Sequence, residues 1–136
     1  MKIIFENMFV KYKLNINTNI LLITIKKLYP SDTEWEETIQ YIKYYYNYAE
    51  KENLIFSIIF DLRNMGLLSF KQINEWGDLF ISYKEKTKLY IKCSTMITDN
   101  YIIKNVLNIF FNLYTTVKPM QIVSNINDAY NFINSI

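Results

Sequence analysis

The sequence predicts a single α/β domain, residues 1–136, built on a mostly parallel sheet. A chain of this length can bury roughly two-thirds of its unfolded surface without a metal or a disulfide. Along the chain, apolar patterns typical of strands alternate with patterns typical of helices, which favours parallel strands joined by right-handed crossovers. The expected order is β-β-α-β-α-β-α-β-α, with four helices and no linker.

The first two elements predict an antiparallel hairpin. Apolar and polar residues alternate from Lys11 to Asn17, which is the two-residue period of a half-buried strand. A short turn at Thr18 and Asn19 leads into the β-branched run Ile20 to Lys26, which suits a better buried strand. Two strands joined this tightly favour antiparallel pairing and would form one edge of the sheet.

The next segment predicts a long helix followed by a central strand. Ser31 and Glu34 have the spacing of a capping box, and apolar residues then recur every three or four positions up to about Asn53. The run Leu54 to Phe60 is apolar except for Ser57 and is followed by Asp61, a pattern typical of a strand covered on both faces.

The second half of the chain predicts two strands and three helices. Ser69 and Gln72 form a second capping-box pattern, opening a helix that runs to Tyr83. The remaining elements are a strand at Leu89 to Cys93, a helix capped by Asp99 or Asn100, a strand at Met120 to Val123 after Pro119, and a last helix capped by Asn125 or Asn127.

This order and three local sequences resemble the STAS fold, in particular its SpoIIAA-like branch. The strand end Ile58 to Arg63 is similar to the family's strand closing in Asp-Leu, and Lys88 to Cys93 lies where the next strand is expected. Lys118 to Val123, followed by Asn127 to Phe132, is similar to the family's final strand and helix. The resemblance covers roughly residues 10 to 136 and implies a domain that binds rather than catalyses.

The resemblance stops at the phosphorylation motif. Bacterial anti-sigma antagonists of this fold carry Asp-Ser-Ser-Gly at the start of the second helix. Here Ser69 lies where the aspartate would be, and Phe70 and Lys71 occupy the serine positions. The sequence therefore predicts that this phosphoswitch is lost. The CRAL-TRIO lipid-binding fold shares a strand ending in Asp-Leu and is the alternative, although it normally needs a longer chain.

Composition argues against most chemistry. There is no histidine, one cysteine and only two glycines, so the commonest general base, metal-thiolate clusters and glycine-rich phosphate loops are all missing. We therefore expect no enzyme activity, no metal and no cofactor. The abundance of tyrosine, isoleucine, asparagine and lysine reflects AT-rich codons, which suggests a microbe or a large virus.

Charge and hydropathy restrict the partners. The net charge is +2 and the lysines are scattered along the sequence, which argues against nucleic acid as a partner. The longest charge-free stretch, Asn105 to Val117, is shorter than the ~20 apolar residues of a membrane span. No signal peptide is recognisable, so we expect a cytoplasmic protein, located in the host cytoplasm if it is viral.

Three residues could carry chemistry or regulation. Asp61 follows a buried strand at the sheet edge where ligands bind, or it simply holds the next turn and pairs with Arg63. Ser69 could accept a phosphate at a helix N-terminus, or it is a plain N-cap. Cys93 lies beside Lys92, but a buried, inert thiol is favoured without a histidine partner.

Aromatic residues predict an interaction surface. Helical geometry spreads the tyrosines of the first long helix around its circumference, so some of them must be exposed or must cover a partner. The helix after Asn100 is likewise apolar on more than one side. The candidate interface residues are Tyr41, Tyr44, Tyr45, Tyr48, Phe111 and Tyr114.

Three hypotheses for the function follow from these observations. The first is a non-enzymatic interaction or regulatory domain, self-associating as a homodimer or binding another protein through an aromatic helical face. The second is a small carrier of a lipid or another apolar ligand, with its pocket between the sheet and the helix after Asn100. The third is a nucleotide-responsive regulator acting through Asp61 and Ser69.

Overall fold

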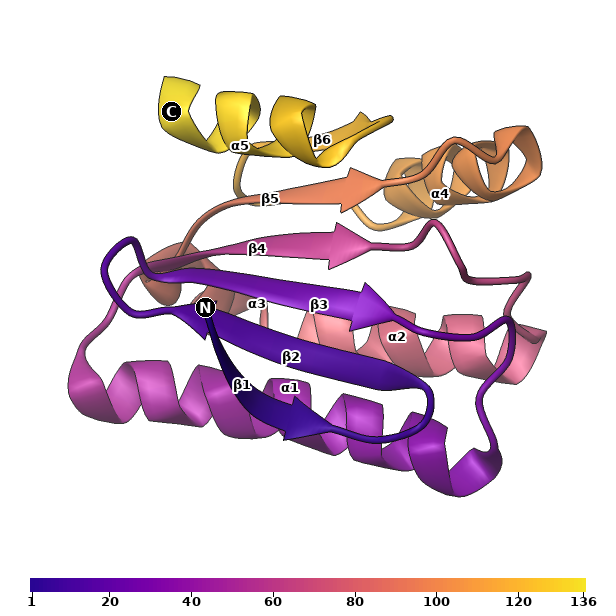
Figure 1. The fold of residues 1–136 in the computed structure, drawn as a ribbon, viewed down its shortest axis with the longest axis horizontal. Helices are drawn as coiled ribbons and strands as arrows, with labels where there is room; N and C mark the ends of the chain where they lie inside the picture. Colours follow the sequence, from indigo (N-terminus) through magenta and orange to yellow (C-terminus); the bar gives the residue numbers. More distant parts are fainter.

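The structure is a computed structural model that describes residues 1–136. Its centre is a six-stranded sheet in the spatial order β1-β2-β3-β4-β5-β6, so every strand pairs with its neighbours in the sequence (Figure 1). The first two pairings are antiparallel and the remaining three are parallel. The strands are β1 (Lys2–Glu6), β2 (Val10–Asn15), β3 (Ile20–Ile25), β4 (Phe56–Asp61), β5 (Ile91–Ile97) and β6 (Met120–Val123).

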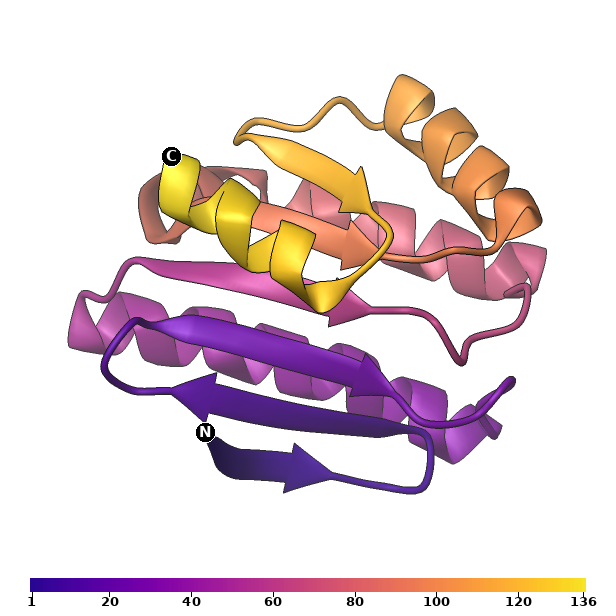
Figure 2. The same cartoon turned by 45° about the horizontal axis from the view of Figure 1, so that its top comes forward.

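Five helices surround the sheet. They are α1 (Asp32–Glu52), α2 (Phe70–Ser82), α3 (Lys84–Tyr90), α4 (Tyr101–Leu113) and α5 (Ile126–Ser135). The first four lie on one side, and α5 alone lies on the other (Figures 1 and 2). None of these helices is long and apolar enough to cross a membrane.

Local sequence explains where the helices begin and end. Ser31 and Ser69 both form complete capping boxes, with Glu34 and Gln72 respectively, as predicted. Asn53 ends α1 in the left-handed conformation that asparagine tolerates. Of the paired alternatives for the last two helices, Asn100 and Asn125 are the caps. The Asn100 side chain accepts hydrogen bonds from the backbone amides of Ile102 and Ile103, and the Asn125 side chain accepts one from the amide of Asp128.

The sheet separates two apolar cores. The larger core joins α1 and α2 to the sheet, and its largest fully buried side chains include Tyr12, Phe9 and Phe56. The smaller core lies under α5 and contains Ile59, Cys93 and Ala129. The fully buried pattern of β4 confirms the central strand covered on both faces.

Two elements differ from the sequence prediction. The predicted hairpin is present as β2 and β3, but β1 pairs outside β2, so β1 and not the hairpin forms that edge of the sheet. A fifth helix, α3, occupies Lys84–Tyr90, and the strand predicted at Leu89 to Cys93 begins only at Ile91 and continues to Ile97. Helix α3 begins with Lys-Glu-Lys-Thr-Lys, which are mostly good helix formers, and it follows α2 after a single residue, Tyr83.

Candidate functional site

Asp61 and Ser69 have structural partners and do not meet. Asp61 is buried at the end of β4, and both of its carboxylate oxygens accept from the Arg63 guanidinium, at 2.9 and 2.8 Å. The hydrogen bond and charge of Asp61 raise the pKa of Arg63. This is the pairing that the sequence offered as the alternative to ligand binding. No hydrogen bond links Asp61 to Ser69.

Ser69 is the N-cap of α2 and forms a complete capping box with Gln72. Its hydroxyl accepts from the Gln72 amide at 3.1 Å, while the Gln72 side chain accepts from the Ser69 amide at 3.0 Å. The side chain is exposed, but its oxygen already serves α2. Phosphorylation would therefore compete with an existing capping bond.

The cap predicts a measurable loss of stability. Replacing Ser69→Ala removes an acceptor for one of the unpaired amides of the first helical turn, and we expect it to lower the free energy of unfolding by about 1 kcal/mol. Ser82→Ala, an exposed serine at the other end of α2 without a side-chain hydrogen bond, is the matched control and should be neutral. Urea denaturation of both variants measures the difference; equal stabilities would contradict the cap.

The tyrosines of α1 are divided between core and surface. Tyr45 is 3% exposed and packs edge-to-face on Phe56, so its prediction as an interface residue is wrong: it faces the sheet. Tyr41 is half-buried, stacks on Phe5 and donates to the Ile4 carbonyl. Only Tyr44 and Tyr48 remain exposed, on opposite sides of Tyr45 and Tyr46 in the sequence.

The two candidates near the end of α4 are half-buried and face inward. Phe111 lines an apolar cavity and packs on Phe80. The Tyr114 ring packs at a tilt against Phe110, and it lies so close to Gly77 of α2 that a β-carbon on Gly77 would be 2.5 Å from it. Gly77 therefore allows α2 and the end of α4 to approach each other. Cys93 is fully buried beside Ser57, in agreement with the buried thiol that the sequence favoured.

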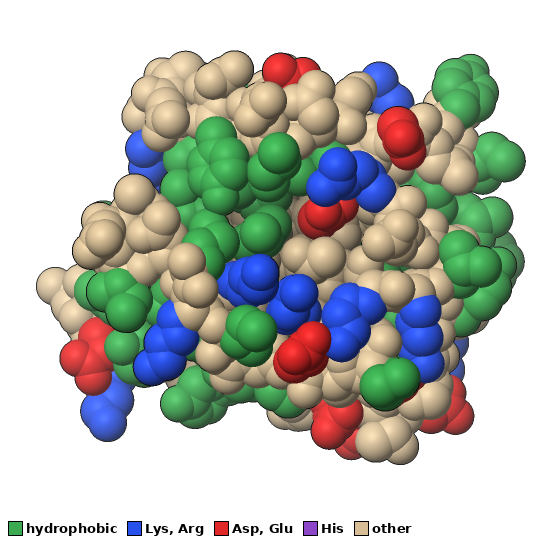
Figure 3. Space-filling view, in the orientation of Figure 1, with side chains coloured by type: hydrophobic (Ala, Val, Ile, Leu, Met, Phe, Trp, Pro, Cys, Tyr) green, Lys and Arg blue, Asp and Glu red, His purple; other side chains and the backbone are tan.

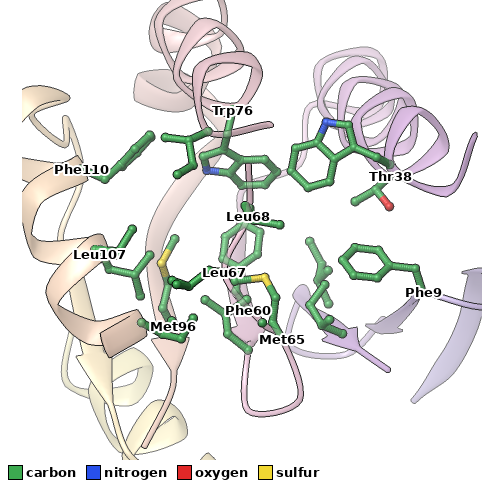
Figure 4. A pocket seen from close by; sticks show the side chains of 18 of the residues that line it. Phe9, Thr38, Phe60, Met65, Leu67, Leu68, Trp76, Met96, Leu107 and Phe110 are labelled. Atoms are coloured by element: carbon green, nitrogen blue, oxygen red, sulfur yellow. The ribbon is translucent and has the colours of Figure 1, made fainter. Parts of the chain in front are cut away.

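An apolar cavity lies between the sheet, α1, α2 and α4. Its volume is about 90 Å³, and 18 of its 20 lining residues are hydrophobic. Figure 4 shows Phe60 and Met96 rising from the sheet, Trp76 closing the cavity from α2, and Leu107 and Phe110 closing it from α4. The loop residues Met65, Leu67 and Leu68 complete the wall.

The outer side of α4 is also apolar. Ile102, Ile109 and Leu113 follow one another at intervals of seven and four residues, which places them on one face of the helix. Tyr101 begins the same helix, and in Figure 2 the N-terminal ends of α2 and α4 lie toward the same edge of the molecule. We call the exposed apolar residues of this region the α4 patch: Leu67, Phe70, Tyr101, Ile102, Ile109 and Leu113.

The α4 patch is large for a monomer. Its residues are 48 to 86% exposed, and Figure 3 shows apolar side chains gathered at the edge where α2 and α4 begin. Counting ~150–200 Å² for each large side chain when fully exposed, the six side chains together expose roughly 600–800 Å². The largest apolar patch of a typical monomer is about 300–600 Å². The sequence signalled this surface through the all-round apolar character of α4, but it assigned the interface to Phe111 and Tyr114 instead.

A solved structure resembles the whole chain. It is the crystal structure of an uncharacterised protein of the DUF3478 family from Shewanella loihica, described as having a SpoIIAA-like fold. The TM-score is 0.61, and the match covers 95% of this chain and 98% of that chain. The chain has a SpoIIAA-like fold.

The likeness extends to the fold alone, because the two sequences are 10% identical. No protein-family model and no curated protein sequence matches the chain. The SpoIIAA-like fold places the carboxyl ends of the parallel strands beside the first turns of α2 and α4, and the cavity and the α4 patch both adjoin this end (Figure 1).

Proposed function

We propose that this SpoIIAA-like chain is a non-enzymatic interaction or regulatory domain that self-associates through the α4 patch. The observation that carries the proposal is the exposure of six large apolar side chains along α4 and around the start of α2, with Phe70 at 86% and Tyr101 at 76%. Exposed apolar surface of this size marks protein–protein contacts in soluble proteins. The roles of Asp61 and Ser69 as ion-pair and capping residues favour binding over catalysis.

A second copy is the partner that the patch fits. Its roughly 600–800 Å² is close to the ~800 Å² that each partner buries in a standard interface. From Asn105 to its end at Leu113, α4 carries no charge, so two copies can meet along this stretch without repulsion between like charges. Asn105, Asn108 and Asn112 are exposed on α4, and their amides can each donate and accept across a two-fold axis.

Light scattering tests the self-association. The wild-type chain should be a dimer at tens of micromolar, and Ile109→Lys/Leu113→Lys should be a monomer, because a lysine at either position would be desolvated in the interface without a partner charge. Both residues are more than 60% exposed, so thermal unfolding of this variant should match that of the wild type at a protein concentration low enough for the wild type to be monomeric.

The exposed tyrosines of α1 provide the control. Tyr44→Ser/Tyr48→Ser alters the interface predicted from the sequence and should remain dimeric. A wild-type monomer at these concentrations would overturn self-association altogether. A dimer that survives the α4 variant but is lost in the tyrosine variant would place the interface on α1.

The cavity supports a second candidate function, the binding of a small apolar ligand. At about 90 Å³ the cavity is smaller than the roughly 150 Å³ that accommodates benzene in an engineered protein core. It therefore fits a compact apolar group and is too small for a whole lipid in this conformation. Its position between the sheet and α4 is the one that the sequence indicated for a carrier.

Occupancy of the cavity can be tested directly. Native mass spectrometry should detect a co-purifying apolar molecule, and Val106→Phe, which fills the cavity from α4, should abolish the adduct while preserving the fold. Val106→Ala enlarges the same wall and is the matched control that should retain the adduct. Repeated absence of any adduct from the wild-type chain would exclude this candidate.

A further inference from the structure

One half of the sheet lacks a helix on the side that carries α5. Helix α5 packs over β4, β5 and β6, whereas β1, β2 and β3 are open on that side (Figures 1 and 2). Strands lie about 4.8 Å apart, so three of them make a strip close to the 10–12 Å diameter of a helix. The open half therefore has room for one helix beside α5.

The open half is basic. Lys11 and Lys13 alternate with Tyr12 along β2, so both project to the open side while Tyr12 is buried on the other. Figure 3 shows Lys and Arg side chains in a row across this half of the face. Lys26 pairs with Glu6 at 2.8 Å and Arg63 pairs with Asp61 at 2.8 Å, whereas Lys11 and Lys13 form no ion pair.

The electrostatics of Glu6 report the same concentration of charge. Its pKa is lowered, first by the hydrogen bond from Lys26 and then by the charges of Lys26, Lys11 and Lys13. One exposed carboxylate thus lies within the field of three lysines, and two of these have no other anionic partner. The face therefore has an excess of positive charge, which a partner with carboxylates would neutralise.

Apolar side chains lie between the lysines. Leu22 pairs with Lys13 across β2 and β3, and Ile3 pairs with Lys13 from β1, so both share the open face. Leu22 is half-buried at the margin of the smaller core, and Ile3 is 50% exposed. The face therefore presents apolar contacts flanked by unpaired positive charges.

We propose that the open face of β1–β3 is the docking site for an acidic amphipathic helix of a partner protein. The apolar stripe of such a helix would cover Leu22 and Ile3, and its flanking carboxylates would pair with Lys11 and Lys13. The partner helix would complete the layer that α5 begins. No aromatic side chain of β1–β3 projects to this face, since Phe5 and Tyr12 lie in the opposite core, so it lacks the stacking platform of a single-stranded nucleic-acid site.

The test uses a synthetic peptide of about 18 residues, long enough to form a helix, with leucines at helical spacing flanked by glutamates. Fluorescence anisotropy should show binding that weakens with added salt. Lys11→Glu/Lys13→Glu should weaken it at least about tenfold, and the milder Lys11→Gln/Lys13→Gln should give an intermediate loss. Lys71→Glu/Lys84→Glu, an equal change of charge on α2 and α3, should bind like the wild type.

Several results would overturn the proposal. Unchanged binding by the Lys11 and Lys13 variants, or equal binding of a peptide with lysine in place of glutamate, would exclude the charge pairing. A DNA duplex that binds more tightly than the peptide and is lost in the same variants would assign the face to nucleic acid. The Ile109→Lys/Leu113→Lys variant should bind the peptide normally, so the self-association of the α4 patch can fail without affecting this site.

Discussion

Phe56→Ala is expected to lower the free energy of unfolding by about 3–5 kcal/mol, which is a large part of the 5–15 kcal/mol of a typical domain. Phe56 is 2% exposed and begins β4 against α1. The centroid of its ring lies 4.8 Å from that of Tyr45 and 6.0 Å from that of Tyr46, and both pairs are edge-to-face. Truncation leaves a cavity beneath α1. Tyr46 cannot easily move to fill it, because it also contacts Tyr83 and Thr87.

Phe70 provides a matched control for this experiment. The same substitution, Phe70→Ala, removes a ring that is 86% exposed at the start of α2, so the stability of the monomer should change by less than about 0.5 kcal/mol. Urea denaturation of both variants at low protein concentration gives the comparison. Similar losses at the two positions would mean that Phe56 is not packed as described.

Alkaline pH is expected to unfold the protein, because its buried tyrosines resist ionisation. Burial raises the pKa of Tyr46 to about 12, with a smaller opposing effect from its hydrogen bond to Thr87, and burial raises the pKa of Tyr12 well above its usual value. Below pH 10 the phenol is neutral in both the folded and the unfolded chain, so its burial does not reduce the free energy of unfolding. As the pH rises from 10 to 12 the unfolded chain ionises first, and about 2–3 kcal/mol is lost for Tyr46 alone.

Denaturation at pH 8 and at pH 11.5 measures this loss. Tyr46→Phe removes one ionisable group, so its stability should fall less steeply with pH than that of the wild type, even though the missing bond to Thr87 lowers stability at neutral pH. Tyr44→Phe, on the exposed side of the same helix, is the control. A Tyr46→Phe variant with the wild-type pH profile would show that Tyr46 is not buried in solution.

Local signals in the sequence were sufficient for most of the fold. The capping pairs Ser31 with Glu34 and Ser69 with Gln72 fix helix starts through bonds within four residues, and both are present. The apolar run ending at Asp61 predicted the central strand because a strand buried on both faces is apolar at most of its positions. The resemblance to the SpoIIAA-like fold is confirmed by the solved neighbour.

Other features depend on long-range packing. The strand β1 is short and bulged between Ile3 and Phe5, so it lacks the regular alternation of β2. Tyr44 and Tyr45 are adjacent and identical residues, so the local sequence does not distinguish them. Tyr45 is buried because α1 packs on Phe56 with that side. The cavity and the α4 patch arise for the same reason: the distance of α4 from the sheet depends on contacts such as Tyr114 on Gly77.

The strand order has a consequence for how the chain folds as it leaves the ribosome. Every strand pairs with the one made just before it, so no later segment must insert between strands that are already paired. The hairpins of β1–β3 can close first, α1 then returns the chain for β4, and each following unit adds at the growing edge. Synthesis from the N-terminus, at about 5–20 residues per second, therefore delivers the strands in the order in which the sheet is assembled.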